Sequence, residues 1–360
     1  MMRRLKRLTA LLLTVITAAA LPGCGLSASS FFEENASPKL TKYTGYVFEA
    51  FDTIITVTAY CETQEAFDDL MDTAEAEFLR YHQLFDIYSA SSDFNNLKTV
   101  NDGAGLAPVA VPEEIIDLLS FSKDMYTLTD GCINVAMGSV LKLWHEAREY
   151  NNAFPDDTRL PDADALSEAS KHCSIDDLII NKENGTVFLC DKEMSLDVGG
   201  IAKGFATERV VQSLKEKGYT GFVINAGGNI RTFGTKSDGK SWVIAVTNPG
   251  LPGKGEFLGT VDVDSTSVVT SGSYQRYFEY EGRRYHHIVD PVSLMPENRC
   301  LSVTVVTENS GYADALSTAL FNMETEDGLA FVEKLDGVEA MWVLCDGSEI
   351  YTDGFILKHE

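Results

Sequence analysis

The residues best suited to chemistry lie where a predicted strand gives way to a helix. Residues 195–206 read Ser-Leu-Asp-Val-Gly-Gly-Ile-Ala-Lys-Gly-Phe-Ala. The pattern predicts a strand ending at Asp197, a turn at Gly199 and Gly200, and then a helix with Lys203 in its first turn. Amides at a helix start attract anions, and glycines let a phosphate approach the backbone. The segment indicates either a phosphate-bearing ligand or a tight turn without one, and it matches neither the P-loop nor the GxGxxG pattern.

Two further segments concentrate polar groups near predicted strands. Residues 223–230 contain Asn-Ala-Gly-Gly-Asn, which marks a hairpin turn about as often as a site. Residues 270–277 (TSGSYQRY) and 285–291 (YHHIVDP) bring hydroxyl, guanidinium and imidazole groups into one region. A histidine beside an Asp-Pro turn acts either as a general base or as a capped turn residue.

The fourth motif is Asp-Ala-Leu-Ser-Thr, from Asp314 to Thr318. Residues four apart share one face of a helix, so both side-chain oxygens can meet one hard cation such as Mg²⁺. A surface hydrogen bond between the two is the alternative.

The surrounding pattern predicts helices and strands that are mixed without regular alternation. Apolar stripes at three- and four-residue spacing predict helices over 63–84, from Pro112 onward, and over 140–147, 201–217, 313–321 and 326–335. Alternating or β-branched runs predict strands over 50–60, 222–225, 242–248, 257–264, 277–280, 285–289, 301–307, 340–345 and 350–351, with a hairpin over 178–190 around Asn184-Gly185. This arrangement favours an α+β fold over a doubly wound sheet.

The N-terminal residues predict export. Residues 1–23 have the basic start and short apolar run of a signal peptide, and the small residues before Cys24 resemble a lipobox, in which that cysteine is lipidated. An ordinary cleaved signal with an incidental cysteine is the alternative. We therefore expect a signal peptide over 1–23, a lipidated Cys24 and tether over 24–43, a folded domain over 44–357, and attachment to the outer side of the cell membrane.

Composition excludes some classes of protein. The 360 residues carry 29 Lys+Arg against 54 Asp+Glu, a formal net charge of −25, and loss of residues 1–23 would leave −29. Such acidity argues against a nucleic-acid partner, because phosphate backbones are bound by Lys and Arg. The six remaining cysteines lack zinc-ligand spacing, and the sequence does not assign disulfides between them.

Taken in order, the motifs closely resemble the ApbE family, the FAD:protein FMN transferases, from about residue 50 to residue 344. The resemblance implies an α+β fold of two intimately packed subdomains with FAD bound between them. It also implies an exported, often lipid-anchored and Mg²⁺-dependent enzyme. The expected reaction transfers the FMN moiety of FAD to a Thr or Ser hydroxyl of an exported acceptor protein with a flavinylation motif, and releases AMP. The alternatives are hydrolysis of FAD to FMN and AMP, and a lipoprotein that binds FAD without turnover.

The resemblance also implies roles for individual residues. Asp314, Thr318 and the Gly200 carbonyl match the family's metal ligands, and His287 and Asp314 match catalytic positions. The flavin contacts expected by matching are Phe51, Tyr88, Cys132, Ile133, Asn134, Asp197, Lys203 and His287.

Three positions depart from the family pattern. Phe51-Asp52-Thr53 stands where the family has Met-Gly-Thr, and Asn134 replaces the usual Asp. Leu294 stands where a glycine would allow a positive φ. None of these departures removes an expected metal ligand, so they bear on how the substrate sits rather than on the chemistry.

Overall fold

The computed structural model describes residues 40–359. The predicted signal peptide and Cys24 lie outside this range, as does most of the predicted tether. Strand β1 (Thr41–Ala50) begins inside the range 24–43, so the structure assigns residues 41–43 to the fold and not to the tether. Within residues 40–359, no helix has the length and hydropathy needed to cross a membrane.

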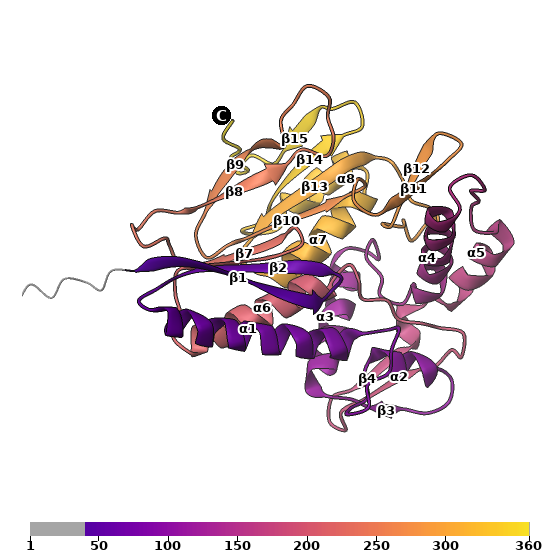
Figure 1. The fold of residues 1–360 in the computed structure, drawn as a ribbon. Helices are drawn as coiled ribbons and strands as arrows, with labels where there is room; N and C mark the ends of the chain where they lie inside the picture. Colours follow the sequence, from indigo (N-terminus) through magenta and orange to yellow (C-terminus); the bar gives the residue numbers. More distant parts are fainter. Residues whose placement is uncertain (1–39, 360) are drawn as a thin grey trace, which may run out of the picture. The chain divides into compact units, whose positions relative to one another are not determined.

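An eight-stranded antiparallel sheet forms the centre of the folded unit (Figure 1). In spatial order its strands are β1, β2 (Thr53–Cys61), β6 (Phe222–Ala226), β7 (Asn229–Phe233), β10 (Ser267–Gly272), β13 (Cys300–Thr307), β14 (Glu339–Leu344) and β15 (Glu349–Tyr351). Residues of β6 alternate between fully and partly buried, as the period of two in a strand requires.

Three helices cover one face of this sheet and make the main core with it: α1 (Gln64–Phe85), α6 (Ala202–Glu216) and α7 (Ser310–Asn322). The apolar stripe of α1 includes Phe67, Leu70 and Phe78. Thr63 caps this helix by accepting a hydrogen bond from the amide of Ala66. Helix α7 is buried on nearly every side, which explains its run of alanine and leucine.

The hairpin of β8 (Trp242–Thr247) and β9 (Phe257–Val263) packs against strands β10 and β14 of the sheet. Its apolar residues form a second core with Val268, Met341 and Val343. The sheet is therefore buried on both faces over β10 and β14.

A third cluster lies beside the end of the sheet. Helix α4 (Gly138–Ala153) packs on the hairpin of β11 (Tyr277–Tyr280) and β12 (Arg283–His286), and α5 (Ala163–Ala169) packs on α4. The remaining elements are α2 (Leu97–Asp102), α3 (Glu113–Leu128), α8 (Thr325–Val332), the three-stranded sheet of β3 (Val109–Ala110), β5 (Thr186–Leu189) and β4 (Leu178–Asn181), and the 3₁₀ turns Ser170–His172 and Ile175–Asp177.

The α+β class predicted from the sequence is confirmed. No boundary between two subdomains stands out, because residues from Leu40 onward form one compact unit. Three predicted elements need correction. Helix α4 extends well beyond 140–147, and the strand expected over 285–289 is β12, which ends at His286. The strand predicted over 50–60 begins at Thr53, because Phe51 and Asp52 form a turn with φ of 55° and 52°.

Candidate active site

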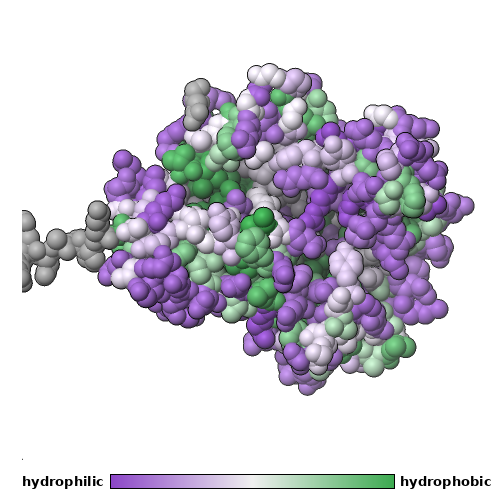
Figure 2. Space-filling view, in the orientation of Figure 1, coloured by the Kyte–Doolittle hydropathy of each residue, from purple (hydrophilic) through white to green (hydrophobic). Residues whose placement is uncertain are grey.

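One cavity of about 480 Å³ collects most of the predicted site residues. Its size is that of a small-molecule site. It is lined by Tyr88, Cys132, Ile133, Asn134, Asp197, Gly200, Lys203, His287, Asp314 and Thr318, among others. Figure 2 shows the surface hollowed between the β1–β2 hairpin and α4, with hydrophilic residues around the recess.

The start of helix α6 faces this cavity. Gly199, Gly200, Ile201 and Lys203 line it, and no side chain caps the helix at Ile201. The Ala202 amide donates to the Val198 carbonyl and the Gly204 amide to Asp314 Oδ2, so most first-turn amides are already paired. The positive end of the helix dipole and the Lys203 side chain still favour an anion there.

Gly204 allows α6 and α7 to approach closely enough to build the site. A Cβ at this position would lie 2.4 Å from Asp314 Cβ and 2.4 Å from the Ser310 carbonyl oxygen. With no Cβ in the way, the Gly204 amide donates a hydrogen bond of 2.8 Å to Asp314 Oδ2. The glycine after Lys203 is thus explained by helix packing.

Asp314, Thr318 and Gly200 lie together as the sequence predicts. Asp314 is 4% exposed, and its Oδ1 lies 3.6 Å from Lys203 Nζ. Thr318 lies against Gly200, with Oγ1 3.5 Å from where a Cβ of that glycine would be. Ser271 on β10 approaches Thr318 Oγ1 at 3.4 Å.

Among residues 40–359, no three His, Cys, Asp or Glu side chains lie close enough together to hold a metal ion by themselves. The group at Asp314 instead offers one carboxylate, one hydroxyl and one backbone carbonyl. Mg²⁺ is commonly held by one or two carboxylates and completed by substrate phosphates and water. The donor set therefore fits Mg²⁺ bound together with a phosphate ligand, rather than a cage made by the protein alone.

The opposite wall is built where two chain segments pair. Asp197 donates its backbone N–H to the Val135 carbonyl at 2.8 Å, and Gly138 donates to the Ser195 carbonyl at 2.9 Å. This pairing aligns the segment from Cys132 to Met137 with the strand-like segment that ends at Asp197. Burial raises the pKa of Asp197, while a hydrogen bond from the Gly199 amide acts in the opposite direction.

Asn134 holds its own loop in place. Its Oδ1 accepts from the amide of Ala136 and its Nδ2 donates to the Cys173 carbonyl, both at 2.9 Å. An aspartate at this position could make only the first of these bonds, which gives a structural reason for the departure from the family pattern.

The two adjacent histidines have different environments. His286 is 2% exposed, donates from Nε2 to the Glu297 carbonyl and accepts at Nδ1 from the Ile288 amide. His287 faces the cavity. Desolvation by the surrounding protein lowers its pKa to about 3, and the charges of Arg276, Arg148 and Lys203 act in the same direction. Its imidazole is therefore neutral at neutral pH, and one ring nitrogen is a hydrogen-bond acceptor.

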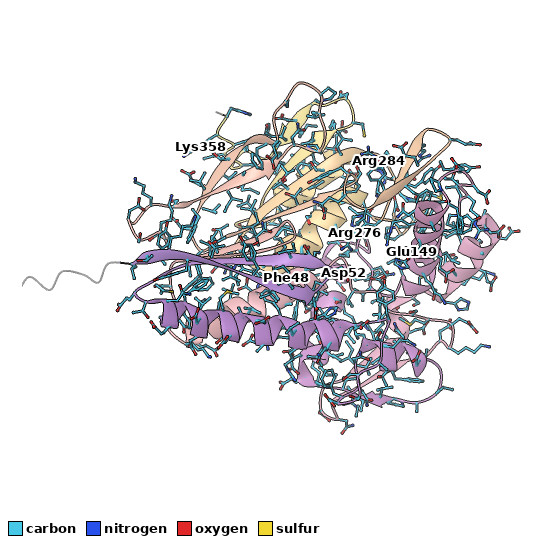
Figure 3. The ribbon with its side chains drawn as sticks, in the orientation of Figure 1. Phe48, Asp52, Glu149, Arg276, Arg284 and Lys358 are labelled. Atoms are coloured by element: carbon cyan, nitrogen blue, oxygen red, sulfur yellow. The ribbon has the colours of Figure 1, made fainter. Side chains whose placement is uncertain are left out.

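One arginine, Arg148, and three aromatic residues of the wall were not predicted as ligand contacts, whereas Arg276 lies in the motif over 270–277 and was expected to offset phosphate charge. Burial lowers the pKa of Arg148 on α4, and the nearby positive charge of Arg276 acts in the same direction. Arg276 Nη2 lies 3.5 Å from the Asp52 carbonyl, and Figure 3 shows these two residues side by side. The stacked rings of Trp144, Phe278 and Tyr285 form the apolar side. Arg148 and Trp144 belong to no local motif, so no sequence signal pointed to them.

Phe51 is the predicted contact that does not line the cavity; Asp52 and Thr53 do. The Phe51 ring instead packs edge-on against His82, with ring centroids 5.7 Å apart. Leu294 adopts a φ of 60°, the left-handed conformation expected of a glycine there. Its carbonyl accepts a hydrogen bond of 2.9 Å from Trp144 Nε1, so the strained turn supports the aromatic wall.

Together these features define an α+β protein with one cavity that gathers the start of a helix, a lysine, two arginines, a buried carboxylate and a neutral histidine. The model of the ApbE family matches residues 51–342, and the chain belongs to that family. It is 35% identical to the FAD:protein FMN transferase of Treponema pallidum over 72% of this chain and 74% of that protein. It is 32% identical to the protein of the same name from Klebsiella pneumoniae, over 73% and 78%. The ApbE protein of Thermotoga maritima has a similar crystal structure, with a TM-score of 0.77, 29% identity, and coverage of 89% of this chain and all of that one.

Proposed function

We propose that this protein transfers the FMN moiety of FAD to a Thr or Ser hydroxyl of an acceptor protein and releases AMP. The observation that carries the proposal is the meeting of α6, Lys203, Asp314 and Thr318 at one cavity, opposite a neutral histidine. Membership of the ApbE family and the names of its relatives support the same reaction.

The diphosphate of FAD would lie at the start of α6. Helix amides and Lys203 would neutralise its charge there, inside a chain whose net charge is −25. Asp314, Thr318 and the Gly200 carbonyl would hold Mg²⁺, which when bound supplies charge stabilisation for phosphoryl transfer. The stacked aromatic wall offers the apolar surface that a flavin or adenine ring needs.

The chemical step needs a proton acceptor for the incoming hydroxyl. We assign this role to Nδ1 or Nε2 of His287, because its imidazole is neutral and faces the cavity. The hydroxyl oxygen forms a bond to the FMN phosphorus, and the bond from that phosphorus to the AMP oxygen breaks. His287 takes the hydroxyl proton, and AMP leaves with the electron pair.

We also propose that the enzyme acts outside the cytoplasmic membrane, held by a lipid on Cys24. The basic and apolar pattern of residues 1–23 and the small residues before Cys24 support this location. Globomycin, which blocks lipoprotein signal processing, and Cys24→Ser, which removes the lipid acceptor, should each cause the unprocessed form to accumulate. Processing unaffected by globomycin would contradict the anchor.

The transfer itself is tested with purified protein, FAD, Mg²⁺ and an acceptor bearing a flavinylation motif. We expect a fluorescent acceptor band that survives a denaturing gel. Free FMN formed without acceptor would instead indicate hydrolysis, and intact FAD after incubation would indicate binding without turnover.

A further inference from the structure

One residue that lines the cavity has a buried amide group without a complete set of hydrogen-bond partners. Asn229, the first residue of β7, is 0% exposed and lines the cavity. Its Oδ1 accepts a hydrogen bond of 2.6 Å from Ser310 Oγ, whereas its Nδ2 has no acceptor. Within residues 40–359, three other buried side chains have an unpartnered polar atom, on Glu77, Ser120 and Arg299, and none of these lines the cavity.

The free Nδ2 lies beside the start of α6. A Cβ at Gly204 would be 2.9 Å from Asn229 Nδ2 and 2.4 Å from Asp314 Cβ, so all three residues meet at one point. The turn before Asn229 is held by the Gly228 amide, which donates to Asn225 Oδ1 at 3.0 Å. The Asn-Ala-Gly-Gly-Asn motif therefore places an amide next to the helix end and the carboxylate.

The surroundings fix the orientation of the Asn229 amide. The Ser310 hydroxyl needs an acceptor, and Asn229 Oδ1 provides it. The reverse orientation would turn the amide oxygen toward the side where the Asp314 carboxylate lies, and two acceptors would then repel each other. The NH₂ group therefore lies on the side of Gly204 and Asp314, next to the start of α6.

We propose that Asn229 is a substrate-binding residue whose Nδ2–H donates to a phosphate oxygen of the flavin nucleotide. The inference rests on the proposed function. A buried donor is normally satisfied, and an amide N–H can pair with an anionic oxygen but cannot ligate a cation. The positive end of the α6 dipole and the Lys203 ammonium, both at the cavity, attract negative charge to the same place. Ser310 acts as a positioning residue that orients the amide.

Two variants test the proposal through binding alone. Asn229→Ala removes the donor, and Asn229→Asp keeps the shape but puts an anionic acceptor where the donor was. FAD affinity is measured by flavin fluorescence at saturating Mg²⁺, and Mn²⁺ affinity by electron paramagnetic resonance without FAD. We expect FAD affinity to fall several-fold in the alanine variant and at least tenfold in the aspartate variant, with no gain in Mn²⁺ affinity in either.

Asn151→Asp is the matched control, since Asn151 is 3% exposed, bonds the Arg159 backbone through both amide atoms and does not line the cavity. It should bind FAD like the unmodified protein. The thermal unfolding midpoint of each apoprotein distinguishes a loss of stability from a loss of FAD binding. A lowered midpoint together with normal FAD affinity would overturn the proposal.

Two other results would also overturn it. Asn229→Asp with tighter Mn²⁺ binding and normal FAD affinity would mean that the amide oxygen faces a metal. Asn229 variants that bind FAD normally, beside an unmodified protein that transfers FMN, would remove this inference and leave the proposed function standing. Failure of the unmodified protein to bind FAD would remove both.

Discussion

Asp314 illustrates how one side chain carries two tasks in this site. Its Oδ2 accepts the Gly204 amide and so fastens α7 to α6, while Oδ1 lies 3.6 Å from Lys203 Nζ on the cavity side. A substitution therefore affects both packing and chemistry, and the two effects need different variants to be told apart.

Asp314→Asn and Asp314→Ala make that separation. Asparagine keeps an acceptor for the Gly204 amide but loses the charge, so we expect FMN transfer to fall at least a hundredfold with nearly unchanged stability. Alanine should lose the same activity and a further ~1–3 kcal/mol of unfolding free energy, because a buried amide is left unpaired. Urea unfolding and initial transfer rates measure the two effects. Normal Mg²⁺-dependent transfer by the asparagine variant would exclude Asp314 as a metal ligand.

His286 makes the stability of the protein sensitive to acid. Burial lowers its pKa from the ordinary 6.5 to about 4. Between pH 4 and pH 6.5 the unfolded chain binds a proton at this histidine that the folded protein does not bind. The contribution of His286 to the free energy of unfolding is therefore fully present above pH 6.5 and is lost as the pH falls toward 4. The effect is at most about 3 kcal/mol.

His286→Gln should therefore lose less stability than the unmodified protein between pH 7 and pH 4.5, as measured by urea unfolding at each pH. His287 shifts in the same direction and leaves part of the acid sensitivity in place. An identical loss in both proteins would show that His286 does not titrate this way.

At the scale of elements, the close approach of α6 and α7 builds the side of the cavity that we propose binds phosphate and cation. Gly204→Ala should force these helices apart, because the new methyl group would lie 2.4 Å from Asp314 Cβ. We expect a loss of roughly 1–3 kcal/mol in unfolding free energy. We also expect FMN transfer to require a higher Mg²⁺ concentration, because Asp314 would be displaced. Gly255→Ala is the control, since nothing lies within 4 Å of that position. Equal stability of the two variants in urea would refute the packing argument.

The turn between β11 and β12 offers a gain in stability. Glu281 and Gly282 have φ of 50° and 76°, the conformation that favours Asn-Gly in a two-residue hairpin. Glu281→Asn should raise the unfolding free energy by about 0.5–1 kcal/mol, because asparagine tolerates the left-handed region better. Glu279→Asn on the adjacent strand should give no gain. Thermal denaturation compares them, and a lower midpoint for Glu281→Asn would contradict this account.

Elements with strong periodicity were predictable, and elements that depend on distant partners were not. The apolar stripe of α1, and Gly218 just after the end of α6, predicted the ends of these two helices to within a residue or two. Strand β1 was missed because it is an exposed edge whose polar residues pair with β2, and β10 because its short hydroxyl-rich run has no alternation. The last turns of α4 are polar and largely exposed, so periodicity could not mark its end.

The residues of the candidate site also fall into those that local motifs predict and those that depend on contacts between distant segments. Asp197, Lys203, Asp314 and His287 lie in dense local motifs, and ten of the eleven predicted residues line the cavity. Arg148 and Trp144 become wall residues only because α4 packs on β11 and β12, a contact between distant segments. Phe51 was misplaced because its turn rotates the ring onto His82.

For the molecule as a whole, a charge of −25 surrounds a cavity that gathers Lys203, Arg148 and Arg276. Bulk acidity and a local cationic pocket are compatible, because field strength at a site is set by its nearest groups and low-dielectric walls. The acidic surface does not account for three cationic side chains at one cavity, whereas an anionic ligand would account for them.

The most direct test of the account is the balance of products in a single reaction with FAD, Mg²⁺ and acceptor protein. Mass spectrometry of the acceptor and chromatography of the released nucleotide measure both sides. We predict one AMP for each FMN attached through phosphate to a Thr or Ser of the acceptor, and no reaction after chelation of the metal. AMP formed with free FMN and an unmodified acceptor would contradict the central claim.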